Sequence, residues 1–329
     1  MTKTEHRDFF RDILSESNIL LAPMAGVTDA AYRQICHKKG FRTMFTEMVS
    51  AKGMVYGNEN TLYLTKLFPS ETNTALQLFG CEAKYMARAI EEYVNKSDFA
   101  FLDINMGCPV RKIVGNGEGS ALLRNPQKLY DLATALVKVS EKPVSAKIRL
   151  GIDGKINASE NAAALEEAGI GMITVHGRTR EMFYSGKADY AQIAKVVGAV
   201  KIPVIANGDI CDYESYKRAL EETGAVGVMI GRAAMGNPFI ISQITSQIAG
   251  EDYIQISAAE KLRTALEHFE LLNEYKGEAI ACNEFRKHLC YYTKGMPGGA
   301  AVRGKVSSLS TAEQFRDYIN KLIGEFSEQ

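Results

Sequence analysis

Residues 101–109 read FLDINMGCP, an apolar run that ends in a cysteine followed by proline. Short β-forming runs of this kind recur along the chain, and helical segments separate them. We expect eight strands, at residues 19–23, 44–48, 75–79, 101–105, 144–148, 172–176, 204–207 and 227–230. Eight strands that alternate with helices predict a parallel (β/α)8 TIM barrel rather than an open sheet.

The segments between and after the strands carry helix signals. Thr28 and Asp29 are candidate caps for one helix, Asn125 and the following proline open another, and Gly169 closes a third. After residue 248 the strand pattern stops, and residues 257–260 have capping-box form before apolar residues at helical spacing. We therefore expect a TIM-barrel catalytic domain over residues 1–247 and a small α-helical domain over residues 248–329.

Composition and charge exclude several classes of protein. The 39 basic residues balance 39 acidic ones, so any surface for a polyanion is regional. The six cysteines form no CxxC pair, which indicates neither a zinc site nor a disulfide framework; we expect no metal. The first 17 residues are polar, and no apolar run is long enough to span a membrane. We expect a cytoplasmic protein, with no obligate protein partner inferred.

Polar residues gather where the predicted strands end. In a parallel barrel these C-terminal ends form the active site. Glycines after the seventh and eighth strands, where barrels commonly bind phosphate, would let backbone amides approach an anion. We expect a phosphate-bearing cofactor to contact Pro23, Met24, Ala25, Gln77, Lys147, His176, Asn207, Gly208, Asp209, Gly231 and Arg232. The alternative is that the glycines only make tight turns.

Three of these residues suit the polar edge of a planar ring. Gln77, Lys147 and His176 come from different strand ends, and a lysine beside the pyrimidine part of a flavin would stabilise the anion formed on reduction. Each has a structural alternative: Gln77 could be a barrel-interior amide and His176 a structural histidine. Lys147 could neutralise Glu47 or Asp103.

Cys108 is the candidate for proton transfer. An unperturbed thiol has a pKa of about 8.5, so it is mostly protonated at neutral pH and still able to give up its proton. A nucleophilic role would require a base, and no histidine is close in sequence. The structural alternative is a buried small residue, the usual fate of cysteine.

Six motifs together resemble the tRNA-dihydrouridine synthases. They are APMAGVTD at 22–29, QLFG at 77–80, NMGCP at 105–109, KIR at 147–149, HGRT at 176–179 and NGDI at 207–210. They occur in the family's order between about residues 18 and 240, and the helical tail is also similar to that of the family. Other flavin barrels share glycine-rich phosphate loops, whereas the opening motif together with NMGCP is specific to this family.

The resemblance implies an enzyme with flavin mononucleotide (FMN) that reduces the bond between carbons 5 and 6 of uridine in tRNA. It also implies NAD(P)H, usually NADPH, as electron donor and Cys108 as the acid that protonates carbon 5. Family members differ in the uridine they reduce, and the motifs leave ribosomal RNA open as an alternative substrate.

An RNA substrate requires contacts beyond the strand ends, because a stacked base must be turned out of its helix to be reduced. Residues 285–311 contain no acidic side chain and carry Arg286, Lys287, Arg303 and Lys305, with Tyr291 and Tyr292 as aromatic surfaces. We expect further RNA contacts from Asn105, Arg111 and Arg178. The alternative is an ordinary solvated helix-loop-helix surface whose tyrosines pack against the barrel.

Three other functions compete with this prediction. A barrel lyase would use Lys147 as a Schiff-base amine on a phosphorylated substrate. A flavin oxidoreductase of a free pyrimidine would need no basic helical tail. A non-enzymatic RNA-binding scaffold would leave Cys108, Lys147 and His176 without a role. An absorbance spectrum separates the lyase from the flavin enzymes, because bound flavin absorbs near-visible light.

Overall fold

Eight parallel strands close into a barrel in the order in which they occur in the chain. The computed structural model describes residues 2–253 and 255–327. The strands are β1 (Ile19–Leu21), β2 (Thr43–Ser50), β3 (Asn73–Phe79), β4 (Phe101–Met106), β5 (Val144–Arg149), β6 (Met172–His176), β7 (Val204–Asn207) and β8 (Gly227–Ile230). The predicted TIM barrel is confirmed, and each predicted strand overlaps an observed one.

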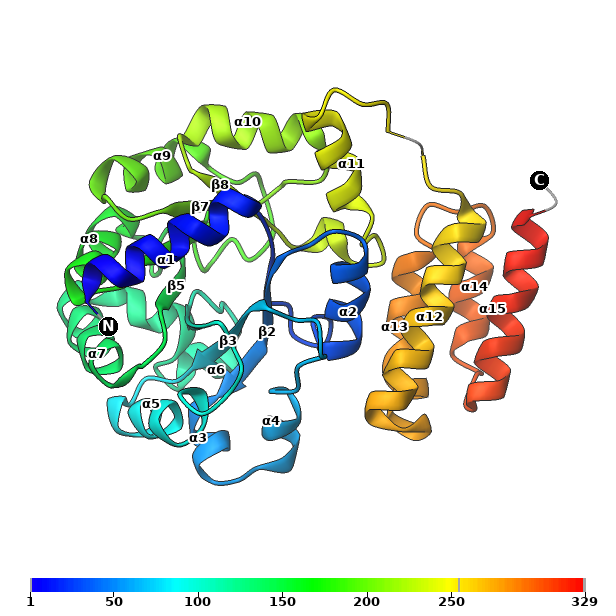
Figure 1. Cartoon of the computed structure of the whole chain (residues 1–329), viewed down its shortest axis with the longest axis horizontal. Helices are drawn as coiled ribbons and strands as arrows, with labels where there is room; N and C mark the ends of the chain where they lie inside the picture. The colour runs from blue at the N-terminus through cyan, green and yellow to red at the C-terminus, as the bar shows by residue number, and fades with distance from the viewer. Residues whose placement is uncertain (1, 254, 328–329) are drawn as a thin grey trace. The chain divides into compact units, whose positions relative to one another are not determined.

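Helices cover the outside of the barrel. Figure 1 shows α7 (Pro126–Val139), α8 (Ala158–Ala168), α9 (Tyr190–Ala199) and α10 (Tyr213–Thr223) following one another around it. The Asn125 side chain caps α7 and Gly169 ends α8 in the left-handed region, as predicted. The remaining elements of this part are α3 (Ala51–Val55), α4 (Glu59–Tyr63), α5 (Ala83–Ala89), α6 (Arg111–Gly115), the π-helical turn η1 (Ile90–Val94) and the 3-10 turn η2 (Gly119–Arg124).

One helix that the sequence did not predict closes the N-terminal end of the barrel. Helix α1 (Lys3–Glu16) runs across the barrel in Figure 1 and inserts Phe10 among Phe45 and Phe101. The rings of Phe10 and Phe101 meet edge to face with centroids 5.1 Å apart. This end is therefore an apolar core, and polar side chains collect at the opposite end.

The chain divides into two compact units, and the division differs from the predicted boundary. The first holds residues 1–25 and 42–231, with the whole barrel sheet; the second holds residues 26–41 and 232–329. The second unit contains α2 (Ala30–Lys38), the 3-10 turn η3 (Arg232–Ala234), α11 (Ile240–Ile248), α12 (Ala258–Lys276), α13 (Glu278–Tyr292), α14 (Gly299–Val306) and α15 (Ala312–Ser327). The helices predicted after residue 248 are present, but α2 groups with them because it packs against α12.

The second unit has its own apolar core and buried polar groups. Helix α12 packs against α13 and α15, and Figure 1 shows the three side by side. Ser257 caps α12 by accepting a hydrogen bond from the Glu260 amide, as predicted. Within residues 2–253 and 255–327, no helix has both the length and the apolar content needed to cross a membrane.

Candidate active site

Strand register brings the polar residues of the C-terminal ends together. Gln77 is aligned with Asp103 between β3 and β4, and Asn105 with Lys147 between β4 and β5. His176 of β6 is aligned with Arg149 on one side and with Asn207 on the other. Five neighbouring strands thus supply one polar cluster, which we call the mouth cluster: Gln77, Asp103, Asn105, Cys108, Lys147, Arg149, His176 and Asn207.

The loop that carries Cys108 is held by hydrogen bonds on both sides of the residue. Asn105 Oδ1 accepts from the amides of Gly107 (3.3 Å) and Cys108 (3.0 Å), and the Cys108 carbonyl accepts from the Ser120 amide and hydroxyl. Arg149 Nε donates to the Gly107 carbonyl at 3.0 Å. The thiol is therefore presented from a fixed backbone.

The environment of Cys108 keeps its proton in place at neutral pH. Burial raises the pKa of the thiol, and this effect outweighs the hydrogen bond from Val110 and the positive charges of Arg149 and Lys147, which lower it. A thiol with a raised pKa is a poor nucleophile but remains available as an acid. The geometry thus suits proton donation better than thiolate chemistry.

Lys147 places an ammonium group in the same cluster. Its Nζ donates to Asn207 Oδ1 at 2.9 Å, and Asn207 is itself oriented by donating Nδ2 to the Met229 carbonyl at 2.8 Å. Desolvation and the neighbouring Arg149 lower the pKa of Lys147 to about 8. Within residues 2–253 and 255–327, no carboxylate forms an ion pair with this ammonium, so its remaining donors suit an acceptor-rich or anionic ligand.

Asp103 is a member of the cluster that sequence reasoning missed as a site residue. It is fully buried, and its two oxygens accept from Ser145 Oγ (2.6 Å) and Gln77 Nε2 (2.7 Å). Burial raises the pKa of Asp103 to about 6, while those hydrogen bonds and Lys147 act in the opposite direction. The signal in the sequence was a single acidic residue inside the apolar run at 101–104.

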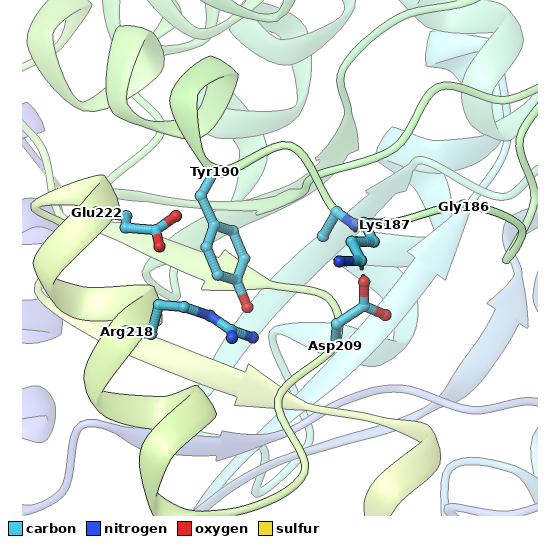
Figure 2. Close-up of a pocket in the computed structure, with 7 residues that line it drawn as sticks. Gly186, Lys187, Tyr190, Asp209, Arg218 and Glu222 are labelled. Carbon is cyan, nitrogen blue, oxygen red and sulfur yellow. Dashed lines mark hydrogen bonds between the residues drawn. The ribbon is translucent and has the colours of Figure 1, made fainter.

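The loops after β6 and β7 are joined by a buried arginine. Arg178 is 1% exposed; it donates to both carboxylate oxygens of Asp209 at 2.7 Å and to the carbonyls of Ser185 and Gly186. Figure 2 shows Asp209 also accepting a hydrogen bond from the loop beside Lys187, which is the Ala188 amide at 2.7 Å. In this state the donors of Arg178 hold the loop, and its predicted RNA contact stays a prediction.

Glycine is required at the first of the two predicted phosphate loops. Gly208 has φ +125°, and a Cβ there would lie 2.8 Å from the Ala188 Cβ and 3.1 Å from the His176 ring. Asp209 follows in the left-handed region with φ 57°. His176 is buried, with Nε2 3.3 Å from the Arg178 guanidinium. The turn thus brings backbone and imidazole close together at the end of β7.

The loops after β1 and β8 meet each other as well. A Cβ at Gly231 would meet only the Ala22 Cβ at 3.6 Å and the Met24 sulfur at 3.9 Å, so the glycine leaves its backbone open. Pro23 and Met24 are partly exposed and Ala25 is exposed, directly after β1. Arg232 is exposed and begins η3. These residues remain predictions as cofactor contacts.

A polar cavity of about 510 Å³ lies beside the loops predicted to bind phosphate, and the residues of the mouth cluster do not line it. Figure 2 shows Tyr190, Arg218 and Glu222 on one side of it and Asp209 and Lys187 on the other. The Tyr190 hydroxyl donates to the Gly208 carbonyl at 2.8 Å. Because none of the mouth cluster lines this cavity, we place the candidate active site at the strand ends.

The predicted RNA residues of the second unit differ in their surroundings. Arg303 and Lys305 are exposed on α14, whereas Arg286 donates to the Leu309 carbonyl at 2.9 Å and 3.3 Å. The Lys287 ammonium lies over Gly26, where a Cβ would be 2.7 Å from Nζ. In the first unit, Arg111 is exposed at the start of α6.

One aromatic prediction is wrong. Tyr292 is 1% exposed, and its hydroxyl lies 3.4 Å from His268 Nδ1, so it packs inside the helices and offers RNA no stacking surface. Tyr291, its neighbour, remains partly exposed. Helical periodicity explains the difference, because consecutive residues on α13 face different directions.

Comparisons with known proteins agree on one family. The family model described as dihydrouridine synthase (Dus) matches residues 20–326. A protein of Rickettsia conorii named probable tRNA-dihydrouridine synthase is 40% identical over 89% of this chain and 89% of its own length. Probable tRNA-dihydrouridine synthase 1 of Synechocystis is 40% identical over 93% of this chain and 86% of its own. For tRNA-dihydrouridine synthase B of Xanthomonas axonopodis, the identity is 36% over 93% of both chains.

Proposed function

Since the chain belongs to the dihydrouridine synthase family, we propose that it reduces the double bond between carbons 5 and 6 of specific uridines in tRNA. The proposal includes FMN as cofactor, NAD(P)H as electron source, with NADPH the usual one in the family, and Cys108 as proton donor. The observation that carries it is the mouth cluster, where a protonated thiol in the loop after β4 and a desolvated ammonium on the adjacent strand β5 occur together. Because the proposed substrate is tRNA, the proposal also places the reaction in the cytoplasm.

The residues of the mouth cluster fit a flavin phosphate ester. Lys147 has donors beyond the one used by Asn207, and among the described residues no carboxylate forms an ion pair with it, so it can donate to an electron-rich ring edge. Gly231 leaves its backbone accessible for the phosphate, with Arg232 next in the chain, and the tight turn at Gly208 lies beside the His176 ring. Gln77, His176, Asn207 and Asp209, together with the loop of Pro23, Met24 and Ala25, would complete the cofactor site.

Cys108 acts after the cofactor in this proposal. Bound FMN, once reduced, would supply hydride to carbon 6 of the uracil, which leaves carbon 5 in need of a proton. The raised pKa of Cys108 keeps that proton on the thiol at neutral pH, and the bonds to Asn105 fix the backbone that carries it. Arg149, which anchors the same loop, holds positive charge near the thiolate formed by the transfer.

The RNA would be held by residues outside the mouth cluster. Exposed basic side chains suit phosphate contacts, and Arg111, Arg303 and Lys305 are exposed. Asn105, Arg178, Arg286 and Lys287 complete the proposed set, although Arg178 and Arg286 use donors within the protein.

The cofactor proposal is tested by heat release and chromatography. We expect the purified protein to be yellow and to release FMN. Recovery of flavin adenine dinucleotide alone, or of no flavin after reconstitution, would contradict the proposal.

The role of Cys108 is tested by separating the two half-reactions in a stopped-flow instrument. Cys108→Ala should keep flavin reduction by NADPH but slow oxidation of the reduced protein by tRNA by about 10²–10⁴-fold, the range for loss of general acid catalysis. Cys81→Ala is the matched control, because Cys81 is also partly buried and its thiol donates to the Asn116 carbonyl, outside the mouth cluster. Equal oxidation rates in Cys108→Ala and the wild type would remove the thiol from the mechanism.

A further inference from the structure

An unbroken series of hydrogen bonds leads from the interior of the barrel to the Cys108 backbone. Gln77 Nε2 donates to Asp103 Oδ2 (2.7 Å), and Asn105 Nδ2 donates to Gln77 Oε1 (2.9 Å). Asn105 Oδ1 then accepts from the Cys108 amide (3.0 Å). Asp103, Gln77 and Asn105 are at most 8% exposed, so water does not compete strongly for these bonds. We call this series the amide relay.

Each end of the amide relay selects the orientation of the amide next to it, and the two selected orientations are compatible. At one end, the Cys108 backbone N–H only donates, so Asn105 must face it with Oδ1 and present Nδ2 to Gln77. At the other end, an ionised carboxylate only accepts, so Gln77 must face Asp103 with Nε2. A flip of either amide would place two donors or two acceptors against each other. The relay therefore has one fully satisfied arrangement.

Neighbouring residues hold Asp103 and Gln77, the first two residues of the amide relay, in place. Ser145 Oγ donates to Asp103 Oδ1 at 2.6 Å, which leaves Oδ2 for Gln77. The Gln77 backbone amide donates to Thr46 Oγ1 at 3.0 Å, at the irregularity in β2 where its register with β3 shifts. Side chain and backbone of Gln77 are thus both anchored from neighbouring strands.

We propose that Asp103 is a positioning residue for Cys108, which acts through Gln77 and Asn105 by fixing the polarity of their two amides. The acceptor at Asp103 Oδ2 makes Gln77 an acceptor toward Asn105, and Asn105 in turn holds the amides of Gly107 and Cys108. The effect of Asp103 on catalysis rests on the proposed function, because the position of the Cys108 thiol affects the reaction with RNA only if Cys108 is the proton donor.

The proposal is tested by exchanging Asp103 for residues with and without an acceptor, in the flavin-loaded protein. Asp103→Leu removes the acceptor and frees Gln77 to rotate, so hydrogen–deuterium exchange of the Gly107 and Cys108 amides should rise by about fivefold, the effect of one net hydrogen bond. Asp103→Asn should restore protection, because its oxygen can accept from Gln77 while its NH2 donates to Ser145. Ser145→Ala, which removes a neighbour but no link of the relay, is the control.

The positioning role has a second readout, the oxidation of the reduced protein by tRNA. It should slow in Asp103→Leu and recover in Asp103→Asn. Unchanged amide exchange in Asp103→Leu, or an equal rise in Asp103→Asn, would overturn the relay; full oxidation rates despite lost protection would overturn its role for Cys108. If Asp103→Leu does not fold, Gln77→Met cuts the relay at its next link and should raise exchange of the same amides. A wild type without tRNA-dependent oxidation contradicts the proposed function, while amide exchange still decides the relay.

Discussion

Two lysines of this chain lie in polar clusters shielded from water, and their surroundings shift their pKa values in opposite directions. Lys147, in the mouth cluster, has the Asn207 amide oxygen as its partner; desolvation and Arg149 lower its pKa to about 8. Lys276, in the second unit, pairs with Asp29 at 2.7 Å and Glu284 at 2.6 Å. Burial alone would lower the pKa of Lys276, but the two carboxylates outweigh it and raise the pKa.

The two lysines differ in whether carboxylates of the same cluster neutralise the ammonium charge. The ammonium of Lys276 is neutralised by residues of the same unit, so its burial is consistent with a structural role. The ammonium of Lys147 carries a desolvation cost that the charge of Asp103 offsets only in part, and within the part of the chain that the structure describes no carboxylate forms an ion pair with it. Such an incomplete cluster suits a ligand, and its position at the strand ends agrees with that interpretation.

Removal of the two lysines should therefore have opposite effects on stability. Lys276→Met leaves Asp29 buried without its cation, and we expect a loss of about 3–5 kcal/mol in the free energy of unfolding. Lys147→Met removes a charge whose desolvation outweighs its attraction to Asp103, so it should leave stability unchanged or higher. Urea unfolding of the protein without cofactor measures both. Equal destabilisation by the two substitutions would break the distinction between the clusters.

In cofactor binding, we expect the substitution of Lys147 to have the larger effect and the substitution of Lys276 to have none. Lys147→Met should weaken FMN binding by about tenfold to a hundredfold, the range for a lost hydrogen bond to a charged group, and should slow flavin reduction. Lys276→Met, compared at a temperature where it is folded, should bind FMN as the wild type does. Fluorescence titration of the apoprotein with FMN provides both affinities, and wild-type affinity in Lys147→Met would contradict the proposed cofactor site.

The barrel could be predicted from the sequence because its strands are short β-forming runs at regular intervals. Even β2, which contains an irregularity in its register, was found at residues 44–48 within the observed Thr43–Ser50. Helix α1 was missed, because its 14 residues are largely polar and only Phe10 and a few others face the barrel.

The site could be predicted only as far as residue type and strand position allow. Cys108, Lys147 and Asn207 stand at strand ends, and the structure brings them into one cluster. The amide relay could not be predicted, since it depends on which side chains of β3, β4 and β5 face one another. Nor could the sequence show that the guanidinium groups of Arg178 and Arg286 donate hydrogen bonds to backbone carbonyls. Such contacts join residues distant in sequence and have no local signature.

The buried polar groups of the second unit predict a response to pH. His268 is fully buried, its ring lies 4.7 Å from that of His288, and burial lowers its pKa to about 4 even though Asp29 raises it. An unfolded histidine has a pKa of about 6.5, so the unfolded state takes up the proton first. The stability contribution is thus complete above pH 6.5 and is lost as the pH falls toward 4.

We expect His268 to reduce the free energy of unfolding by about 2 kcal/mol between pH 7 and pH 5. His268→Phe, which cannot take up a proton, should flatten that part of the stability curve. Urea midpoints measured at several pH values test this in both proteins. An identical slope in the variant would mean that other groups cause the acid sensitivity. The buried polar groups around His268 would then not determine how the stability of the second unit depends on pH.

The smallest effect concerns three basic side chains of the second unit that belong to neither lysine cluster: Lys287 is partly exposed, and Arg303 and Lys305 are exposed. If Lys287, Arg303 and Lys305 contact RNA phosphates, each neutral replacement should reduce the slope of log affinity against log salt by roughly one unit. Arg286→Gln should reduce the slope as well and should also lower stability, because its guanidinium donates to the Leu309 carbonyl. Lys217→Gln with Lys321→Gln is the matched control, since both lysines lie near a glutamate one helical turn away. Binding of tRNA across a salt series decides the matter: an unchanged slope in the triple variant would make residues 285–311 a solvated surface and direct attention to Arg111.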